Sequence, residues 1–288
     1  MAKTLLCIGY GYSARAVAAR LIPEGWCVIG TTRRAENAEA IAQTGAEALI
    51  WPSADLSDAL AQADYLLISA GPALDGDPVL EALADVLAKA TFKWVGYLST
   101  TSVYGDHQGA WVDETTPLNP STARGQSRAE AEGAWQATGL PLHIFRLAGI
   151  YGPGRGPFSK VRKGTARRIL KEGQVFSRIH VDDIASALVA SISQPNPGGI
   201  YNLCDDDPAP PQDVIAYAAE LLGLPPPPEV HFEEAELSAM ARSFYAENKR
   251  VRNARLKAEL GVQLRYPSYR DGLPALLAHE QNGTAQTG

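Results

Sequence analysis

Cysteine and long apolar runs are scarce in this sequence. Only three cysteines, Cys7, Cys27 and Cys204, occur in 288 residues, so we expect neither a disulfide framework nor a paired-cysteine metal site. No run approaches the ~18 apolar residues of a membrane-spanning helix, and the N-terminal segment does not resemble an export signal. These features predict a cytoplasmic protein with no membrane partner.

Basic charge is also lacking. The 26 Lys and Arg residues face 32 Asp and Glu, for a net charge of −6, so no nucleic-acid partner is expected. There is no zinc-protease HExxH, no GxSxG, no P-loop and no EF-hand pattern, which disfavours the corresponding hydrolase and nucleotidase chemistries. The acidic runs at 182–183 and 205–207 are interpreted as solvated or helix-capping residues, and no metal is predicted.

What the sequence does contain is an alternation of short apolar runs and alanine-rich helical stretches. With 45% hydrophobic residues, the chain can bury a full core. The apolar runs lie at 4–9, 27–30, 48–51, 65–69, 94–98 and 142–147, and helical periodicity occurs at 13–22, 35–45 and 77–90. This order predicts an α/β fold with a Rossmann-type, doubly wound parallel sheet.

A GxGxxA pattern directly follows the first apolar run. Gly9 permits a tight turn, Gly11 lets the backbone approach a diphosphate, and Ala14 allows close helix–strand packing. The helix that begins here presents free N–H groups to an anion. We therefore predict a dinucleotide site, with an ordinary glycine turn as the alternative. Its candidate residues are Gly9, Tyr10, Gly11, Tyr12, Ser13 and Ala14.

The end of the second apolar run decides between NAD and NADP. An NAD site normally carries Asp or Glu there to bind the ribose 2′-hydroxyl. This chain has Thr31, Thr32, Arg33 and Arg34 instead, with no carboxylate before Glu36. Hydroxyl and guanidinium groups bind a phosphate, so we predict NADP(H), with NAD less favoured. The alternative is that the two arginines only form a solvated helix start.

Proline and glycine become frequent after about residue 150, as in GPGRGPF at 152–158. We predict a dinucleotide-binding domain at 1–150, to which 179–204 returns with a helix and a strand. A smaller, discontinuous substrate lobe is predicted at 151–178 and 205–278, and a flexible tail at 279–288.

Five further segments follow the glycine motif in order: DL at 55–56, SAGP at 69–72, LSTTSVYG at 98–105, RLAGIYGPG at 146–154 and RIHVDD at 178–183. Together they resemble the extended short-chain dehydrogenase/reductase superfamily, which contains the NAD-dependent epimerases and dehydratases, over about residues 4–275. Dimers are common in that superfamily, so a homodimer is among the implied expectations.

The resemblance also implies roles for individual residues. Thr100 matches the Ser or Thr that hydrogen-bonds the substrate oxygen. Other positions match an adenine contact, a turn beside the cofactor ribose and a segment near the nicotinamide. They are Asp55 and Leu56, then Ala70, Gly71 and Pro72, then Leu147, Ala148 and Gly149.

The catalytic Tyr–Lys pair of the superfamily is missing. In the matching stretch at 119–132, Arg124 replaces the tyrosine and Arg128 the lysine. Arginine stays protonated in proteins, so Arg124 is a poor acid–base catalyst. We expect Arg128 to hold a ribose or a phosphate, unless it only pairs with Glu132 on a helix surface.

Four other side chains near the crevice are candidate acids: Tyr104, His107, Tyr151 and His180. Tyr104 and His107 follow the fifth apolar run, on the edge of the sheet where ligands bind. Tyr104 therefore joins Thr100 and Arg128 as a catalytic candidate, with simple packing of the tyrosine as the alternative.

A run of cations follows in the second lobe: Lys160, Arg162, Lys163, Arg167, Arg168 and Lys171. These residues either grip an anionic substrate or form a solvated helix face. The leading hypothesis is an NADP(H)-binding oxidoreductase-like protein of the epimerase/dehydratase type. Its small-molecule substrate would be a carbohydrate or nucleotide derivative, anionic if the cations grip it. The alternative is a non-catalytic NADP-binding sensor or scaffold.

Overall fold

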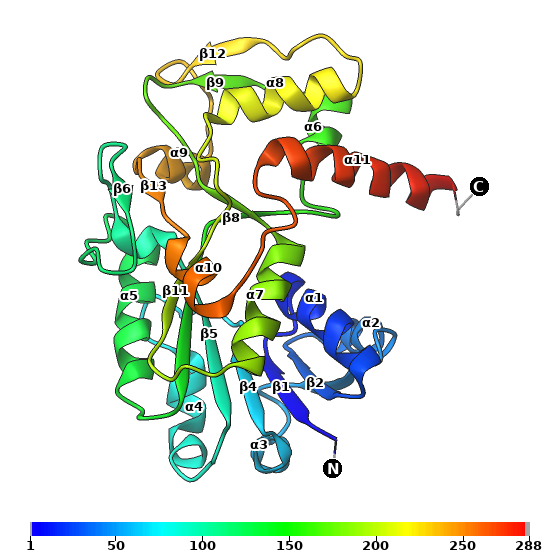
Figure 1. Cartoon of the computed structure of the whole chain (residues 1–288), viewed down its shortest axis with the longest axis vertical. Helices are drawn as coiled ribbons and strands as arrows, with labels where there is room; N and C mark the ends of the chain where they lie inside the picture. Colours follow the sequence, from blue (N-terminus) through cyan, green and yellow to red (C-terminus); the bar gives the residue numbers. More distant parts are fainter. Residues whose placement is uncertain (1, 286–288) are drawn as a thin grey trace.

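A seven-stranded parallel sheet with the order β11–β7–β5–β4–β1–β2–β3 forms the centre of the molecule (Figure 1). The computed structural model describes residues 2–285. The strands are β1 (Thr4–Ile8), β2 (Cys27–Thr32), β3 (Glu47–Ile50), β4 (Tyr65–Ile68), β5 (Trp94–Thr100), β7 (Leu142–Leu147) and β11 (Ile200–Leu203). The strand order changes direction at β1: β2 and β3 follow on one side of it, and β4 and the later strands lie on the other. Folds of this type bind ligands at this switch point. The predicted Rossmann-type fold is confirmed.

Both faces of this sheet are covered because its strands are apolar on both sides. In β1, Leu5 and Cys7 belong to one core and Leu6 and Ile8 to the other, as strand alternation requires. One face packs against α1 (Tyr12–Leu21), α2 (Ala38–Ala42), α7 (Val181–Ser193) and α10 (Ala254–Leu260). The other packs against α3 (Ser57–Gln62), α4 (Pro78–Leu87) and α5 (Ala123–Gln136).

A second lobe lies beyond the carboxyl ends of the strands, at the top of Figure 1, and has its own core. That core is formed mainly by α6 (Phe158–Arg162), α8 (Pro211–Leu221) and α11 (Tyr269–Ala285). Helix α9 (Ala239–Tyr245) and three parallel strand pairs lie between this core and the sheet or beside it, and Val112, Ile179 and Val251 of these pairs belong to the main core. The pairs are β8 (Gly149–Tyr151) with β10 (Arg178–His180), β9 (Arg168–Leu170) with β12 (Glu229–His231), and β6 (Trp111–Val112) with β13 (Arg250–Val251).

The chain passes between the two lobes more often than the predicted boundaries assume. In the segment 179–204, α7 packs on α1 and β11 pairs with β7. Helix α10 lies in the stretch assigned to the second lobe, yet its Leu256 and Leu260 are part of the main core. Of the predicted tail, 279–285 continue α11, and 286–288 lie outside the described residues.

Within residues 2–285, no helix combines the length and apolar composition needed to cross a membrane. The same part of the chain contains no group of three or more His, Cys, Asp or Glu side chains arranged to hold a metal ion.

Candidate functional site

The turn between β1 and α1 has a backbone that only glycine suits at its first position. Gly9 has φ +89°, and a Cβ there would stand 2.8 Å from the backbone nitrogen of Ala70. The Gly9 N–H donates to the Thr31 Oγ1 at 2.8 Å, and the Tyr10 N–H donates to the Thr31 carbonyl. Thr31 is 3% exposed. Its predicted contact with a cofactor phosphate is therefore wrong: the hydroxyl holds the turn in place.

The N-terminus of α1 is open to an anion. No described heavy atom lies within 4 Å of where a Cβ of Gly11 would stand. The first helical bond joins the Arg15 N–H to the Gly11 carbonyl at 2.9 Å, so the N–H groups of Tyr12, Ser13 and Ala14 precede the bonded ladder. Among the described residues, the first turn of α1 has no acidic side chain that would repel an anion. A dinucleotide diphosphate fits this geometry.

Tyr10, by contrast, packs inside the protein. Its ring lies under Gly30, where a Cβ would stand 2.5 Å from the Tyr10 Cδ2, and its hydroxyl is 2.8 Å from the Thr44 Oγ1. The side chain is therefore not available to a cofactor, and only its backbone borders the turn.

The end of β2 lies beside this turn. Cys7 of β1 is level with Gly30 of β2, so the residues after Thr32 border the open N-terminus of α1. Arg33 and Arg34 are both exposed. Arg34 lies 3.4 Å from Glu36, but both side chains are more than 70% exposed, so this pair is weak. The two guanidinium groups are accessible to a phosphate, and Thr32 binds the Arg34 backbone.

The two predicted adenine-contact residues lie in different environments. Asp55 is exposed and accepts hydrogen bonds from the backbone and the hydroxyl of Ser57 at 2.9 and 2.7 Å. These bonds lower the pKa of Asp55 and stabilise the start of α3. Leu56 is 1% exposed and belongs to the core. A ligand contact through the Leu56 side chain is therefore excluded.

A cavity of about 820 Å³ lies at the carboxyl ends of β4, β5 and β7, between the two lobes. The sheet side contributes the loop at 71–74, Thr100 to Ser102, one face of α5 and the segment 147–151. The second lobe contributes 175–178 and parts of 241–251. The predicted residues that line it are Gly71, Pro72, Thr100, Arg128, Leu147, Ala148 and Gly149, whereas Ala70 does not.

Thr100 ends β5 with its hydroxyl at this cavity. Its Oγ1 accepts the Ser102 N–H at 3.3 Å and lies 3.4 Å from the Ser102 Oγ. The second contact is long, so the proton of Thr100 is available to an oxygen placed in the cavity. The short helix η3 (Thr101–Tyr104) follows directly.

Arg128 reaches from α5 to the side of the cavity that Gly71 and the end of β5 form. Its Nη1 donates to the Leu98 carbonyl at 2.7 Å and to the Tyr97 hydroxyl at 3.3 Å. Its Nη2 lies 2.8 Å from where a Cβ of Gly71 would stand, so the glycine leaves room for the guanidinium. Glu132 binds Arg146 instead. The alternative of an Arg128–Glu132 surface pair is therefore wrong.

The catalytic role predicted for Tyr104 is also wrong, because this residue is fully buried and does not line the cavity. Its hydroxyl donates to the Asn202 Oδ1 at 2.8 Å and accepts from the Arg146 Nη1 at 2.9 Å. Arg146 in turn forms a 2.7 Å ion pair with Glu132, with side chains 4% and 3% exposed. Burial raises the pKa of Tyr104 to about 12. Tyr104 is part of a structural network.

The other candidate acids are also engaged elsewhere. His107 lies outside the cavity lining, with its Nε2 3.1 Å from the Tyr104 carbonyl. Tyr151 borders the cavity, but its hydroxyl donates to the Ser268 carbonyl at 3.4 Å. His180 caps α7 by accepting the Asp182 N–H at 3.1 Å, and burial lowers its pKa to about 4.

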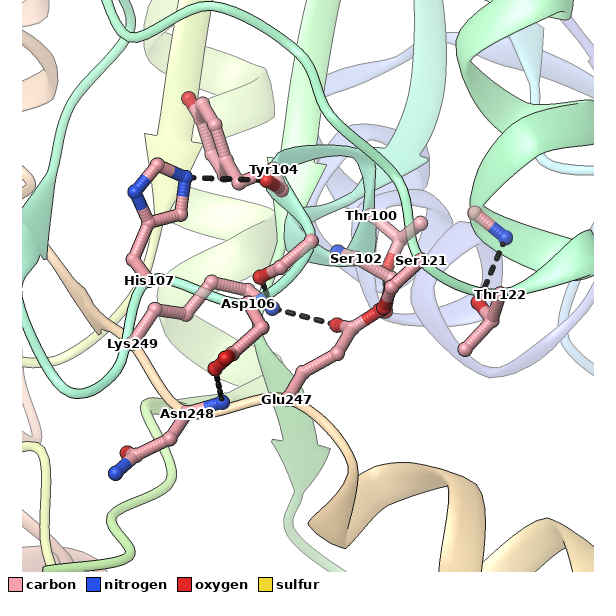
Figure 2. A network of polar contacts seen from close by, with 12 residues as sticks. Thr100, Ser102, Tyr104, Asp106, His107, Ser121, Thr122, Glu247, Asn248 and Lys249 are labelled. Atoms are coloured by element: carbon pink, nitrogen blue, oxygen red, sulfur yellow. Dashed lines mark hydrogen bonds and ion pairs between the residues drawn. The ribbon is translucent and has the colours of Figure 1, made fainter.

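Sequence reasoning missed two charged residues that the second lobe brings to the cavity. Figure 2 shows Glu247 between Lys249 and Ser121. The Lys249 Nζ donates to the Glu247 Oε2 at 2.6 Å and to the Gly105 carbonyl at 2.7 Å, and the Ser121 hydroxyl donates to the Glu247 Oε1 at 2.7 Å. The charged side chains are only 8% and 10% exposed. These partners are 126 and 144 residues apart in sequence, so no local pattern indicated them.

The cations at 160–171 do not line this cavity. Arg162 pairs with Glu280 at 2.6 Å, and Arg168 pairs with Glu229 at 3.0 Å. Lys171 donates to the Tyr245 carbonyl. The arrangement favours the interpretation of this run as structural and solvated.

The sequence matches the NAD dependent epimerase/dehydratase family over residues 8–204. The chain belongs to this family. It is 32% identical to protein YeeZ of Escherichia coli (strain K12) over 285 residues, covering 92% of this chain and 97% of that protein.

Among solved structures, a conserved protein of unknown function from Silicibacter pomeroyi DSS is 62% identical, with a TM-score of 0.94 over 96% of this chain and 99% of that one. UDP-glucuronic acid 4-epimerase from Bacillus cereus, solved in complex with NAD, is 17% identical with a TM-score of 0.79, covering 95% of each chain. At that identity the likeness shows the shared fold alone.

Proposed function

We propose that this member of the epimerase/dehydratase family is an NADP(H)-dependent oxidoreductase acting on a small carbonyl or hydroxyl compound. The observation that carries the proposal is a continuous edge of the sheet. It begins with the open α1 N-terminus and the exposed arginines after β2, and it continues into the cavity that Thr100 and Arg128 line. A nicotinamide dinucleotide bound there would supply hydride transfer.

The residues of the chain divide the remaining work. The N–H groups of Tyr12 to Ala14 would bind the diphosphate, and the free donors of Arg128 would orient the ribose. Thr100 donates a hydrogen bond to the substrate oxygen. Lys249 has three N–H donors, of which two have acceptors in the protein, so its third is available to the same cavity.

The preference for NADP(H) follows from Arg33 and Arg34. They are exposed beside the turn, where a carboxylate would select NAD. A guanidinium binds a phosphate with two charge-assisted hydrogen bonds, which favours the 2′-phosphate of NADP. Since both side chains are solvated, we expect a preference of about tenfold.

Titration of the whole protein with NADPH and NADH, followed by nicotinamide fluorescence, tests this proposal. NADPH is expected to bind about tenfold more tightly, and the double variant R33A/R34A is expected to bind both equally. Arg167→Ala is the matched control, because Arg167 donates only to carbonyls of its own turn. Tighter binding of NADH by the unchanged protein would overturn the NADP assignment, and no binding of either would overturn the function.

Oxidation of NADPH in the presence of aldehydes, ketones and sugar nucleotides then tests turnover. A substrate that is reduced by the unchanged protein is expected to react more slowly with Thr100→Val, because the donor to its oxygen is removed. Tight cofactor binding with no reduction of any compound in this set would instead support a non-catalytic binding protein.

A further inference from the structure

Two large exposed apolar side chains line the cavity, one from each lobe. Leu74, in the loop after β4, is 71% exposed, and Phe244, on α9, is 54% exposed. Both line the cavity. Of the large exposed apolar side chains in the described part of the chain, the others are Trp111, Leu118, Leu224 and Met240, and none of these lines it. Exposed apolar groups that line one cavity indicate a surface for an apolar ligand group.

The cations that line the cavity differ in whether they have hydrogen-bond or ion-pair partners within the protein. Lys249 is neutralised by Glu247 at 2.6 Å. Arg128 donates to the Leu98 carbonyl and the Tyr97 hydroxyl. Arg178 donates to the carbonyls of Phe176 and Ala209. Arg124 differs from these three cations, because it makes no such contact within the described residues.

Arg124 is exposed and has no hydrogen-bond or ion-pair partner among residues 2–285, yet it lines the same cavity. It lies one helical turn before Arg128 on α5, so the two side chains share one face of that helix. An unpaired guanidinium with its planar fork of donors recognises a carboxylate or a phosphate.

The second lobe supplies little that would hold a nucleotide diphosphate. Its run of cations at 160–171 lies outside the cavity, with Arg162 and Arg168 paired to carboxylates. The second lobe places six apolar side chains at the cavity, namely Val175, Phe176, Ala241, Phe244, Tyr245 and Val251. Its charged side chains there are already engaged, Arg178 with backbone carbonyls and Lys249 with Glu247 and the Gly105 carbonyl. Among the cations that line the cavity, only Arg124 has no partner within the described residues, whereas a diphosphate carries two charges to be neutralised. A ligand with one carboxylate and an apolar body matches Arg124 and the apolar side chains together.

We infer that the substrate is a small amphipathic organic acid. Its carboxylate binds Arg124, and its apolar body lies against Leu74 and Phe244. This inference rests on the proposed function, because a cofactor held by Arg128 would occupy the Gly71–Arg128 side of the cavity and would leave Arg124 and Phe244 to the substrate. It also assigns Arg124, the residue in place of the tyrosine, to substrate binding rather than to proton transfer.

Calorimetric titration of the whole protein, with and without saturating NADPH, tests the inference with four probes. Phenylacetate has both the carboxylate and the apolar body, phenylacetamide lacks the charge, acetate lacks the body, and UDP-glucose represents a sugar nucleotide. Phenylacetate is expected to bind at least tenfold more tightly than each of the other three.

Two variants separate the two contacts. Arg124→Gln is expected to weaken phenylacetate at least tenfold and to leave phenylacetamide unchanged, whereas Phe244→Ser is expected to weaken both by a similar factor. Arg167→Gln, outside the cavity, is the matched control for the loss of an arginine. Each variant is first shown to unfold at the same denaturant concentration as the unchanged protein.

Tighter binding of UDP-glucose than of phenylacetate would overturn the inference. The inference would also be overturned if Arg124→Gln weakened the binding of phenylacetate and of phenylacetamide by the same factor. Failure of the proposed function gives a different result, because the heat of NADPH binding is then absent while the phenylacetate titration of the cofactor-free protein is still measured.

Discussion

The glycine turn and the substrate cavity share one edge of the sheet, but different parts of the chain build them. The turn consists of backbone N–H groups and small residues within a single strand–helix unit, with Gly9 and Gly11 giving access. The cavity consists of long side chains from both lobes, such as Arg124, Arg128 and Lys249. The first region is determined locally and suits any dinucleotide. The second depends on tertiary packing.

Helix α5 shows the same division within one element. Its inner face carries Glu132, 2% exposed, which accepts from Arg146 and from the Ser99 hydroxyl. Its cavity-facing side carries Arg124 and Arg128. One helix therefore carries two sets of charges, one buried in a structural ion pair and one lining the cavity.

The largest effect on stability is expected when the buried Glu132–Arg146 ion pair is broken. Glu132→Gln leaves the guanidinium of Arg146 buried with no counter-charge, so the free energy of unfolding is expected to fall by about 3–5 kcal/mol. Glu130→Gln, on the exposed side of the same helix, is the control, with a change below about 0.5 kcal/mol. Urea denaturation measures both. Equal, small losses would show that the buried network does not stabilise this region.

The glycine turn gives the next largest effect. Gly9→Ala forces a Cβ to within 2.8 Å of the Ala70 nitrogen at positive φ, so the free energy of unfolding is expected to fall by about 1–3 kcal/mol and NADPH binding to be lost. Gly11→Ala has room for its Cβ in the protein, so it is expected to cost about 1 kcal/mol or less while still weakening NADPH binding. Full NADPH affinity in Gly11→Ala would contradict a diphosphate at this turn.

The smallest effect concerns Asp205, which is 1% exposed at the base of the second lobe. Burial raises the pKa of this carboxyl to about 8, so the folded protein keeps a proton that the unfolded chain releases above about pH 4. Stability is therefore expected to fall as the pH rises toward 8. The low pKa of His180 has the opposite effect, but only between about pH 4 and 6.5.

Between pH 6.5 and 8, we expect the free energy of unfolding of the unchanged protein to fall by about 1–2 kcal/mol because of Asp205. In Asp205→Asn this contribution to the fall is expected to be absent. Asp85→Asn, exposed on α4, is expected to follow the unchanged protein. If the free energy of unfolding changed with pH by the same amount in all three proteins, Asp205 would not have a raised pKa.

The two regions also differ in how far the sequence predicted them. The glycine turn and the main strands were predictable because their signals are local: an apolar run, a GxGxxA pattern and a helix. Tyr104 was misassigned because its partners, Arg146 and Asn202, lie on β7 and β11, and only folding brings them to it. The Glu247–Lys249 pair had no signal at all, since it meets Ser121 and Gly105 from more than 120 residues away.

The crystal structure of the protein grown with NADPH tests the central claim most directly. We expect density for the diphosphate over the N–H groups of Tyr12 to Ala14, for the 2′-phosphate beside Arg33 and Arg34, and for the nicotinamide between Thr100 and Gly149. A cofactor bound elsewhere, or crystals with no cofactor density at saturating NADPH, would contradict the account.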